Sequence, residues 1–146
     1  MKIACTVLSD GDLADARKEI SQVQKLVETA AGTLAVKVRT AAPRKSGALI
    51  SGIIPSPWEE KSKYPGKIVR QVYFDANMND TFVKIAKSGK RYYYPASQEY
   101  GFLIANRTGT QTKRVPGKYF MHQTFVEYVP VFVTEAEDLI EKVVSK

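Results

Sequence analysis

One long apolar periodicity constrains the fold of this chain more than any other feature. Between residues 13 and 42, apolar side chains recur at steps of three and four residues. They are Leu13, Ala16, Ile20, Val23, Val27, Ala30, Leu34, Val38 and Ala41. Such spacing places one apolar stripe along a single helix, which is roughly 45 Å long. A helix of this length is expected to project in part from the domain. Its stripe is expected to form the core, with an oligomer seam as the alternative.

Proline and alternating side chains divide the next part of the chain into shorter segments. Pro43 ends the first helix, because proline disfavours helical geometry in the residue before it. Alternating side-chain positions predict strands at residues 3–8 and 68–74. A further strand is expected at residues 81–87, and residues 92–94 follow it after a turn as the next strand. The simplest connection of the later strands is an antiparallel meander.

The remaining segments are expected to be two loops and two helical pieces. Residues 55–66 and 101–117 are loops by composition, and loops of such length are usually functional. Residues 95–99 predict one helical turn that begins with proline. A last helix is expected from Phe120 to the end of the chain, and Pro130 is expected to kink or break it.

The predicted fold is therefore a single α+β domain spanning residues 1–146. An antiparallel β-sheet is flanked by a long N-terminal helix and a C-terminal helix. The chain is 44% hydrophobic and 25% charged, which is close to the average of a globular domain. At this length it can bury a core without help from a metal or a disulfide.

The net charge of +7 is unevenly distributed along the sequence. Residues 1–50 carry a net +3, residues 51–118 a net +7 and residues 119–146 a net −3. Such asymmetry indicates an anionic partner or an electrostatically steered contact between proteins.

No residue pattern typical of an active site is visible. Cys5 is the only cysteine and His122 the only histidine, so neither a disulfide nor a zinc site of cysteines and histidines is expected. The sequence contains no GxSxG, GxGxxG or P-loop motif. We therefore assign no catalytic, cofactor-binding or metal-binding residue. A small nuclease or toxin that uses His122 with glutamate or tyrosine side chains is the enzyme alternative. A signal peptide and a membrane span are not expected either.

A basic and aromatic segment follows the middle of the chain. Its basic residues are Lys84, Lys87, Lys90, Arg91, Arg107, Lys113, Arg114 and Lys118. Three consecutive tyrosines, 92–94, accompany them. Binders of single-stranded nucleic acid combine cations for the phosphates with rings that stack on bases. A solvated lysine-rich sheet edge, which discourages aggregation, explains the same pattern.

Three motifs resemble those of the tail-completion, or head–tail joining, proteins of long-tailed bacteriophages. Residues 41–53, AAPRKSGALISGI, resemble the family's APxxxGxLxxSI segment. Residues 94–101, YPASQEYG, resemble its YAxxxEyG element. Residues 116–125, PGKYFMHQTF, resemble its PaxPFlxpA entry into the last helix. The motifs occur in the family's order and cover most of the chain.

The resemblance implies a structural virion protein rather than an enzyme. Copies would form an oligomeric ring at the phage neck, between the head connector on the portal side and the tail-terminator or tail-tube proteins. DNA would pass through this ring and could touch a basic loop. The protein would be made in the cytoplasm of the bacterial host and end in the virion, without a membrane or a cofactor.

The resemblance and the loop composition also select candidate residues. The expected partner-contact residues lie in the two long loops: Trp58, Lys61, Lys63, Arg107, Lys113 and Arg114. The positions expected to carry architecture are Pro43, Gly47, Leu49, Glu99, Gly101 and Phe120. Among them, Glu99 is expected either to pair with Arg91 or Arg107 or to cap a helical turn. Gly101 is expected to take a positive φ.

Overall fold

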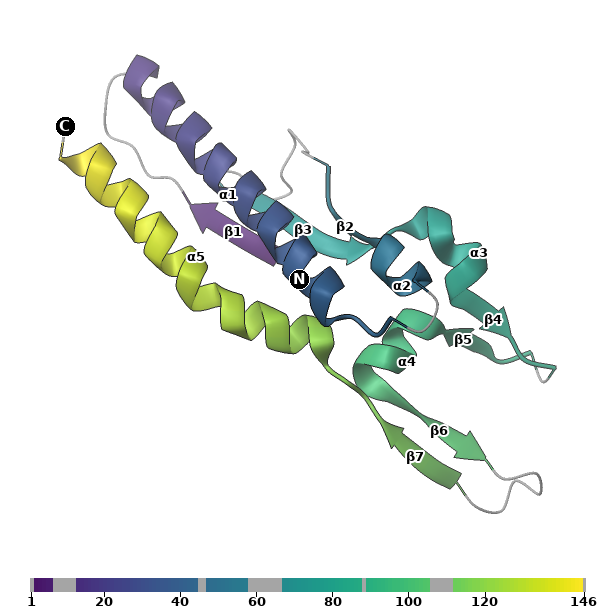
Figure 1. Cartoon of the computed structure of the whole chain (residues 1–146). Coiled ribbons are helices and arrows are strands. Elements are labelled where there is room, and N and C mark those ends of the chain that lie inside the picture. Colours follow the sequence, from purple (N-terminus) through teal and green to yellow (C-terminus); the bar gives the residue numbers. More distant parts are fainter. Residues whose placement is uncertain are drawn as a thin grey trace.

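Two long antiparallel helices and a small sheet form an elongated α+β fold (Figure 1). The computed structural model describes residues 2–6, 13–44, 47–57, 67–87, 89–105 and 112–145. Helix α1 spans Leu13–Ala41 and helix α5 spans Phe120–Val144. Helix α1 packs against the sheet on one side and against α5 on the other. The predicted fold class is confirmed, as is the extent of the first helix.

The central sheet has three antiparallel strands in the order β1-β3-β2. They are β1 (Lys2–Thr6), β3 (Lys67–Phe74) and β2 (Ile53–Pro55). In β3, Ile68, Arg70 and Val72 alternate with less buried neighbours, so one face of the strand is turned to the core. Strand β3, with 8 residues, is the longest of the described strands, and it lies at the centre of this sheet.

The core lies where α1 meets β3 and the first half of α5. The buried apolar residues of α1 are Val27, Ala30, Ala31, Leu34, Ala35 and Val38. From the other elements, Leu49, Ile53, Val72, Phe120 and Tyr128 join them. The core begins only at Val27, whereas Ile20 on the same helix is 37% exposed. The first turns of α1 therefore project beyond the core, as the length of the helix predicts.

Short helical pieces connect these elements. Helix α2 spans Ala48–Ser51 and helix α4 spans Tyr94–Tyr100, with proline in its first turn as expected. The 3-10 helix η1 (Ala76–Met78) and helix α3 (Asn79–Phe82) follow strand β3.

The expected meander is wrong at residues 81–87. Only Val83–Ile85 form a strand, β4, and it pairs with β5 (Arg91–Tyr93) apart from the central sheet. The Asp75 carboxylate accepts a hydrogen bond from the Asn77 backbone at 2.9 Å and starts η1 instead of a tight turn. Phe82 ends α3 and is fully buried, with its ring edge-on to that of Phe74. Burial of this one ring decides the helical conformation there.

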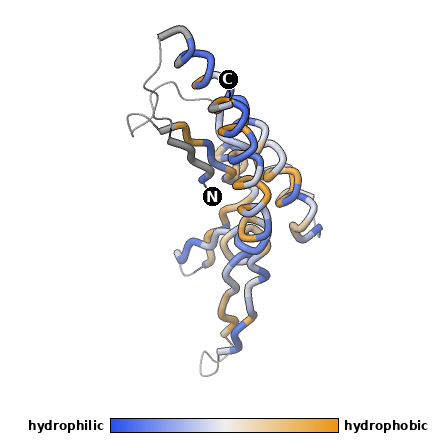
Figure 2. Tube along the Cα trace, turned by 90° about the vertical axis from the view of Figure 1, so that its left-hand side faces the viewer, coloured by the Kyte–Doolittle hydropathy of each residue, from blue (hydrophilic) through white to orange (hydrophobic). Residues whose placement is uncertain are grey.

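The predicted loop at residues 101–117 is also wrong. Strands β6 (Gly101–Ala105) and β7 (Thr112–Pro116) form an antiparallel hairpin, which we call the arm. The arm extends away from both long helices (Figure 1). The hairpin is difficult to recognise in the sequence because β7 is mostly polar. Strand β6 is apolar and lacks the alternation by which a half-buried strand is recognised. Figure 2 shows the contrast in hydropathy between the two strands.

Helix α5 runs through Pro130 without ending there. Of the two expected effects of Pro130, a kink or a break, the break is therefore wrong. Pro130 is exposed, and its missing N–H removes one hydrogen bond from the ladder. Packing of Phe125, Tyr128 and Phe132 against the core holds the helix on both sides of the proline.

Candidate functional site

The Glu99 carboxylate caps the N-terminus of α5. Its Oε2 accepts a hydrogen bond from the Met121 backbone N–H and its Oε1 one from that of His122, both at 3.0 Å. The first N–H groups of a helix have no partner within the helix, and a negative charge is favourable beside them. The side chain is 5% exposed. The expectation of a capping carboxylate is thus met, although the capped helix lies 22 residues further along the chain.

Two glycines allow the backbones at the base of the arm to come into close contact. Gly101 has a φ of +84°, as expected, and a Cβ there would lie 2.6 Å from the backbone nitrogen of Gly117. A Cβ on Gly117 would collide with the backbone of Glu99 and Tyr100. The backbone N–H of Tyr119 donates to the Glu99 carbonyl at 3.0 Å, and that of Lys118 to the Gln98 carbonyl at 2.9 Å. The arm, α4 and α5 are therefore joined through backbone contacts.

Both faces of the arm are exposed and partly apolar. Phe102 is 39%, Leu103 65% and Ile104 48% exposed, and Val115 is half-buried. In the hairpin register Phe102 faces Val115 and Ile104 faces Lys113, while Leu103 faces Arg114. Successive side chains of a strand point to opposite faces. Phe102, Ile104, Val115 and Lys113 therefore share one face, and Leu103 and Arg114 lie on the other.

Helix α5 presents a second apolar row that its own fold does not use. Val126 is 53%, Val129 38%, Val133 44% and Ile140 58% exposed. The spacing of three, four and seven residues puts the four side chains on one side of the helix, which we call the outer row. The core-facing residues Phe120, Thr124 and Tyr128 lie on a different side. A helix with two apolar rows can pack on its own core and on a second body at once.

The β4–β5 hairpin carries much of the basic segment. Lys84, Lys87, Lys90 and Arg91 are exposed on it. Tyr92 is 43% exposed, with the Lys90 ammonium 5.6 Å from its ring centre. Tyr93 packs edge-on against Phe82, and burial raises the pKa of its hydroxyl while the charge of Arg91 opposes that rise. Of the three consecutive tyrosines, Tyr92 is thus the one available to stack on a ligand.

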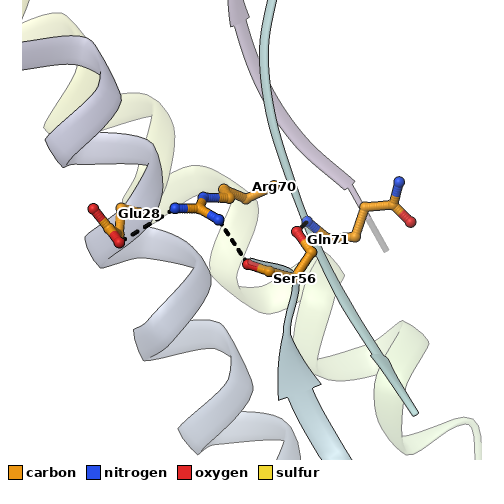
Figure 3. A network of polar contacts seen from close by, with 4 residues as sticks. All are labelled: Glu28, Ser56, Arg70 and Gln71. Atoms are coloured by element: carbon orange, nitrogen blue, oxygen red, sulfur yellow. Dashed lines mark hydrogen bonds and ion pairs between the residues drawn. The ribbon is translucent and has the colours of Figure 1, made fainter. Parts of the chain in front are cut away.

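A polar cluster ties α1 to the sheet (Figure 3). Arg70 of β3 is 4% exposed and forms an ion pair with Glu28 of α1, with 3.2 Å between Nη2 and Oε1. Its Nη1 donates to the Ser56 carbonyl at 2.7 Å. The Ser56 hydroxyl accepts from the Gln71 backbone N–H at 3.1 Å. The cluster fixes the position of α1 on the sheet, which is a structural role.

The surroundings of His122 do not assemble a catalytic group with Glu99. Both Glu99 oxygens already accept from backbone N–H groups, and the bond to His122 comes from its main chain. The imidazole itself is on an exposed residue. Within the described ranges no three histidine, cysteine, aspartate or glutamate side chains gather to hold a metal ion. No helix in the described part of the chain is long and apolar enough to cross a membrane.

The structure describes two of the six predicted contact residues. Lys113 and Arg114 are exposed, on strand β7 rather than in a loop. Trp58, Lys61, Lys63 and Arg107 lie outside the described residues.

The predicted architectural positions all lie at bends or in the core. Leu49 is 1% and Phe120 4% exposed, and Pro43 follows the end of α1. Gly47 has a φ of +72° at the start of α2. Glu99 and Gly101 join the arm to α5, as described above.

Sequence reasoning missed the two surfaces that stand out most. The outer row of α5 was overlooked because the last helix has apolar residues on more than half of its circumference. Its spacing of three, four and seven was available as a signal. The arm could have been suspected from Phe102, Leu103 and Ile104, three consecutive large apolar residues in a supposed polar loop.

Comparison of the chain with protein-family models, with curated proteins and with solved structures finds no match.

Proposed function

We propose that this protein is a structural subunit of a bacteriophage neck, a tail-completion or head–tail joining protein that assembles into a ring. The observation that carries the proposal is the arm, a projecting hairpin with large apolar side chains on both faces. An isolated two-stranded hairpin is marginally stable in water, and exposed apolar surface of this kind marks a contact with another protein.

The roles of the motif residues support the same function. Pro43, Gly47, Glu99, Gly101 and Phe120 turn the chain, cap a helix or fill the core. A motif set of this kind preserves a shape. That agrees with a protein that acts by fitting between neighbours.

The proposal is tested in the phage or prophage that encodes the chain. Deletion of the gene is expected to leave DNA-filled heads and free tails that do not join, as seen by electron microscopy. Expression of the intact chain in trans is expected to restore joined particles that contain several copies per virion by mass spectrometry. Normal infectious particles after deletion would refute the neck function. Genes for portal, capsid and tail-tube proteins beside this one are expected as well.

Contact with nucleic acid is a second candidate, favoured by the placement of the basic side chains. The β4–β5 hairpin and the arm both lie away from the C-terminal half of α5, where the acidic residues are concentrated (Figure 1). Binding through phosphates weakens steeply with salt. Binding to single-stranded DNA that falls steeply with salt, and that Tyr92→Ala weakens without changing the salt slope, would favour this candidate. Salt-independent or absent binding would count against it.

A further inference from the structure

We infer that the arm of one copy docks on the outer row of α5 of a second copy of this chain. The contact deepens the proposed neck function and rests on it only in assuming that the copies assemble with one another. The interface is heterologous, because the arm and the outer row are different surfaces. Repetition of such a contact makes a ring when the rotation closes.

The arm offers one face that suits a helix. Phe102, Ile104 and Val115 form an apolar strip, and Lys113 lies directly across from Ile104. The apolar strip runs over three residues of β6, from Phe102 to Ile104, and is about 7 Å long. The outer row from Val126 to Ile140 extends about 21 Å along its helix. The strip therefore covers one section of the outer row, comparable to the distance of about 6 Å from Val129 to Val133 along the helix.

The charges beside the two strips are complementary. Lys113 borders the apolar strip of the arm and is exposed. On α5, Glu137 lies four residues after Val133 and three before Ile140, so it falls within the outer row. Glu141 follows one turn later and is exposed too. Pairing of Lys113 with these acids would set the register of the contact and speed its formation.

The arm docks on the outer row of another copy and not on its own, because it points away from the α5 of its own chain (Figures 1 and 2). A nucleic acid fits the outer row poorly, since Glu137 and Glu141 would repel its phosphates. A second copy supplies both the apolar strip and the lysine that the row lacks. The observations therefore favour self-association over the other occupants.

Two pairs of substitutions test the contact. Ile104→Asp on the arm and Val133→Asp on the outer row are each expected to weaken self-association at least about tenfold in sedimentation analysis. Leu103→Asp, on the opposite face of the arm, is the control for the first. Val131→Asp is the control for the second, because Val131 is 46% exposed against 44% for Val133 and points to the other side of α5. All four side chains are exposed, and circular dichroism checks that each variant is folded.

Mixing the two disruptive variants distinguishes this contact from a symmetric one. The intact arm of Val133→Asp can still dock on the intact outer row of Ile104→Asp. At a concentration where each variant alone is monomeric, the mixture is therefore expected to form a dimer that grows no further. Failure to form this dimer, or equal disruption by Leu103→Asp and Val131→Asp, overturns the inference.

Charge exchange and crosslinking complete the test. Lys113→Glu is expected to weaken self-association, and Glu137→Lys in the second copy is expected to restore it. A photo-crosslinking residue at position 104 is expected to capture α5 of another copy even when the contact is weak. Absence of that adduct at about 1 mM protein, which would detect a dissociation constant in this range, overturns the inference.

The two proposals fail in different ways. Self-association through another surface overturns the docking contact and leaves the neck function standing. Self-association through the arm and the outer row, in a protein that is absent from virions, overturns the neck function alone. Loss of DNA binding in Lys113→Glu with unchanged self-association assigns the arm to DNA and overturns the docking contact.

Discussion

Glu99 and Met121 are joined by a hydrogen bond that links two helices across the base of the arm. The Met121 backbone N–H donates to Glu99 Oε2 at 3.0 Å, and the His122 backbone N–H occupies the other carboxylate oxygen. Tyr119, the residue before the helix, makes no side-chain cap and has a φ of +49°. The start of α5 is thus specified by a side chain from α4.

Glu99→Ala is expected to lower the free energy of unfolding by about 1–3 kcal/mol, because it removes a cap and leaves two part-buried N–H groups without that acceptor. Glu99→Gln keeps one acceptor oxygen and is expected to lose less. Urea denaturation measures both. Glu127→Gln, an exposed change on α5, is the control and is expected to alter stability little. Equal stability of Glu99→Ala and the wild type would contradict the cap.

Alanine at four glycines separates steric clash from backbone strain. Gly101→Ala is expected to cost about 3 kcal/mol or more, because a Cβ there meets backbone atoms and φ is positive. Gly117→Ala has the clash alone and is also expected to be strongly destabilising. Gly89→Ala, with φ +78° and open space, is expected to cost about 1–2 kcal/mol.

Gly32→Ala is the fourth member of the series and is expected to stabilise the protein by about 0.5–1 kcal/mol, since it lies in α1 with nothing near its Cβ. Thermal unfolding of the four variants gives the order. A Gly117→Ala variant as stable as Gly32→Ala would show that the backbone of Gly117 does not lie against that of Glu99 and Tyr100.

Substitution of the two members of the Arg70–Glu28 ion pair is expected to have unequal effects. Arg70→Ala should destabilise by about 2–4 kcal/mol, because it empties a buried site and frees the Ser56 carbonyl. Glu28→Gln should cost under about 1 kcal/mol, because the Glu28 side chain is 69% exposed. A double-mutant cycle measured by denaturant unfolding tests this. A larger effect at Glu28 than at Arg70 would reverse the assignment of roles.

Stability is expected to fall in alkaline solution through Tyr128. Burial raises the pKa of its hydroxyl above 10.0, the charge of Glu135 adds to the rise, and a hydrogen bond with Thr33 opposes it. The unfolded chain therefore loses the proton first as the pH rises, and unfolding becomes easier. The contribution is fully present below pH 10.0 and is lost as the pH rises through the folded pKa.

Tyr128→Phe is expected to flatten this loss of stability above pH 10.0. Tyr93→Phe is expected to flatten it as well, because burial raises the pKa of the Tyr93 hydroxyl although the charge of Arg91 opposes that rise. Denaturant midpoints across this pH range check both. An unchanged slope in Tyr128→Phe would exclude its hydroxyl as the cause.

The elements predicted well are those whose signal is local and repeated. The apolar residues of α1 recur through eight successive steps of three or four residues, and β3 is rich in β-branched and aromatic residues. Their burial depends on many side chains, so no single contact could override the pattern. The start of the last helix at Phe120 was likewise visible, because its apolar face begins there.

The elements predicted poorly depend on contacts between distant residues. Residues 81–87 alternate like a strand, yet burial of Phe82 against Phe74 makes the first of them helical. Glu99 is paired with a helix that begins beyond the arm, so its neighbours in sequence suggested an arginine partner instead. The arm has no core of its own, and a pattern that signals burial could not reveal it. Surfaces that await a partner are difficult to recognise for this reason.

The close backbone contact at Gly101 and Gly117 has a mechanical consequence. A pull on the arm is borne at its base by main-chain hydrogen bonds and by packing of peptide against peptide, which do not yield by changing rotamer. The load passes through Tyr119 into the first turn of α5 and from there to α1. Displacement of the base of the arm is therefore expected to reach the pair of long helices. Outward-facing residues on the strands of the arm can then change with a partner's surface without loosening this base.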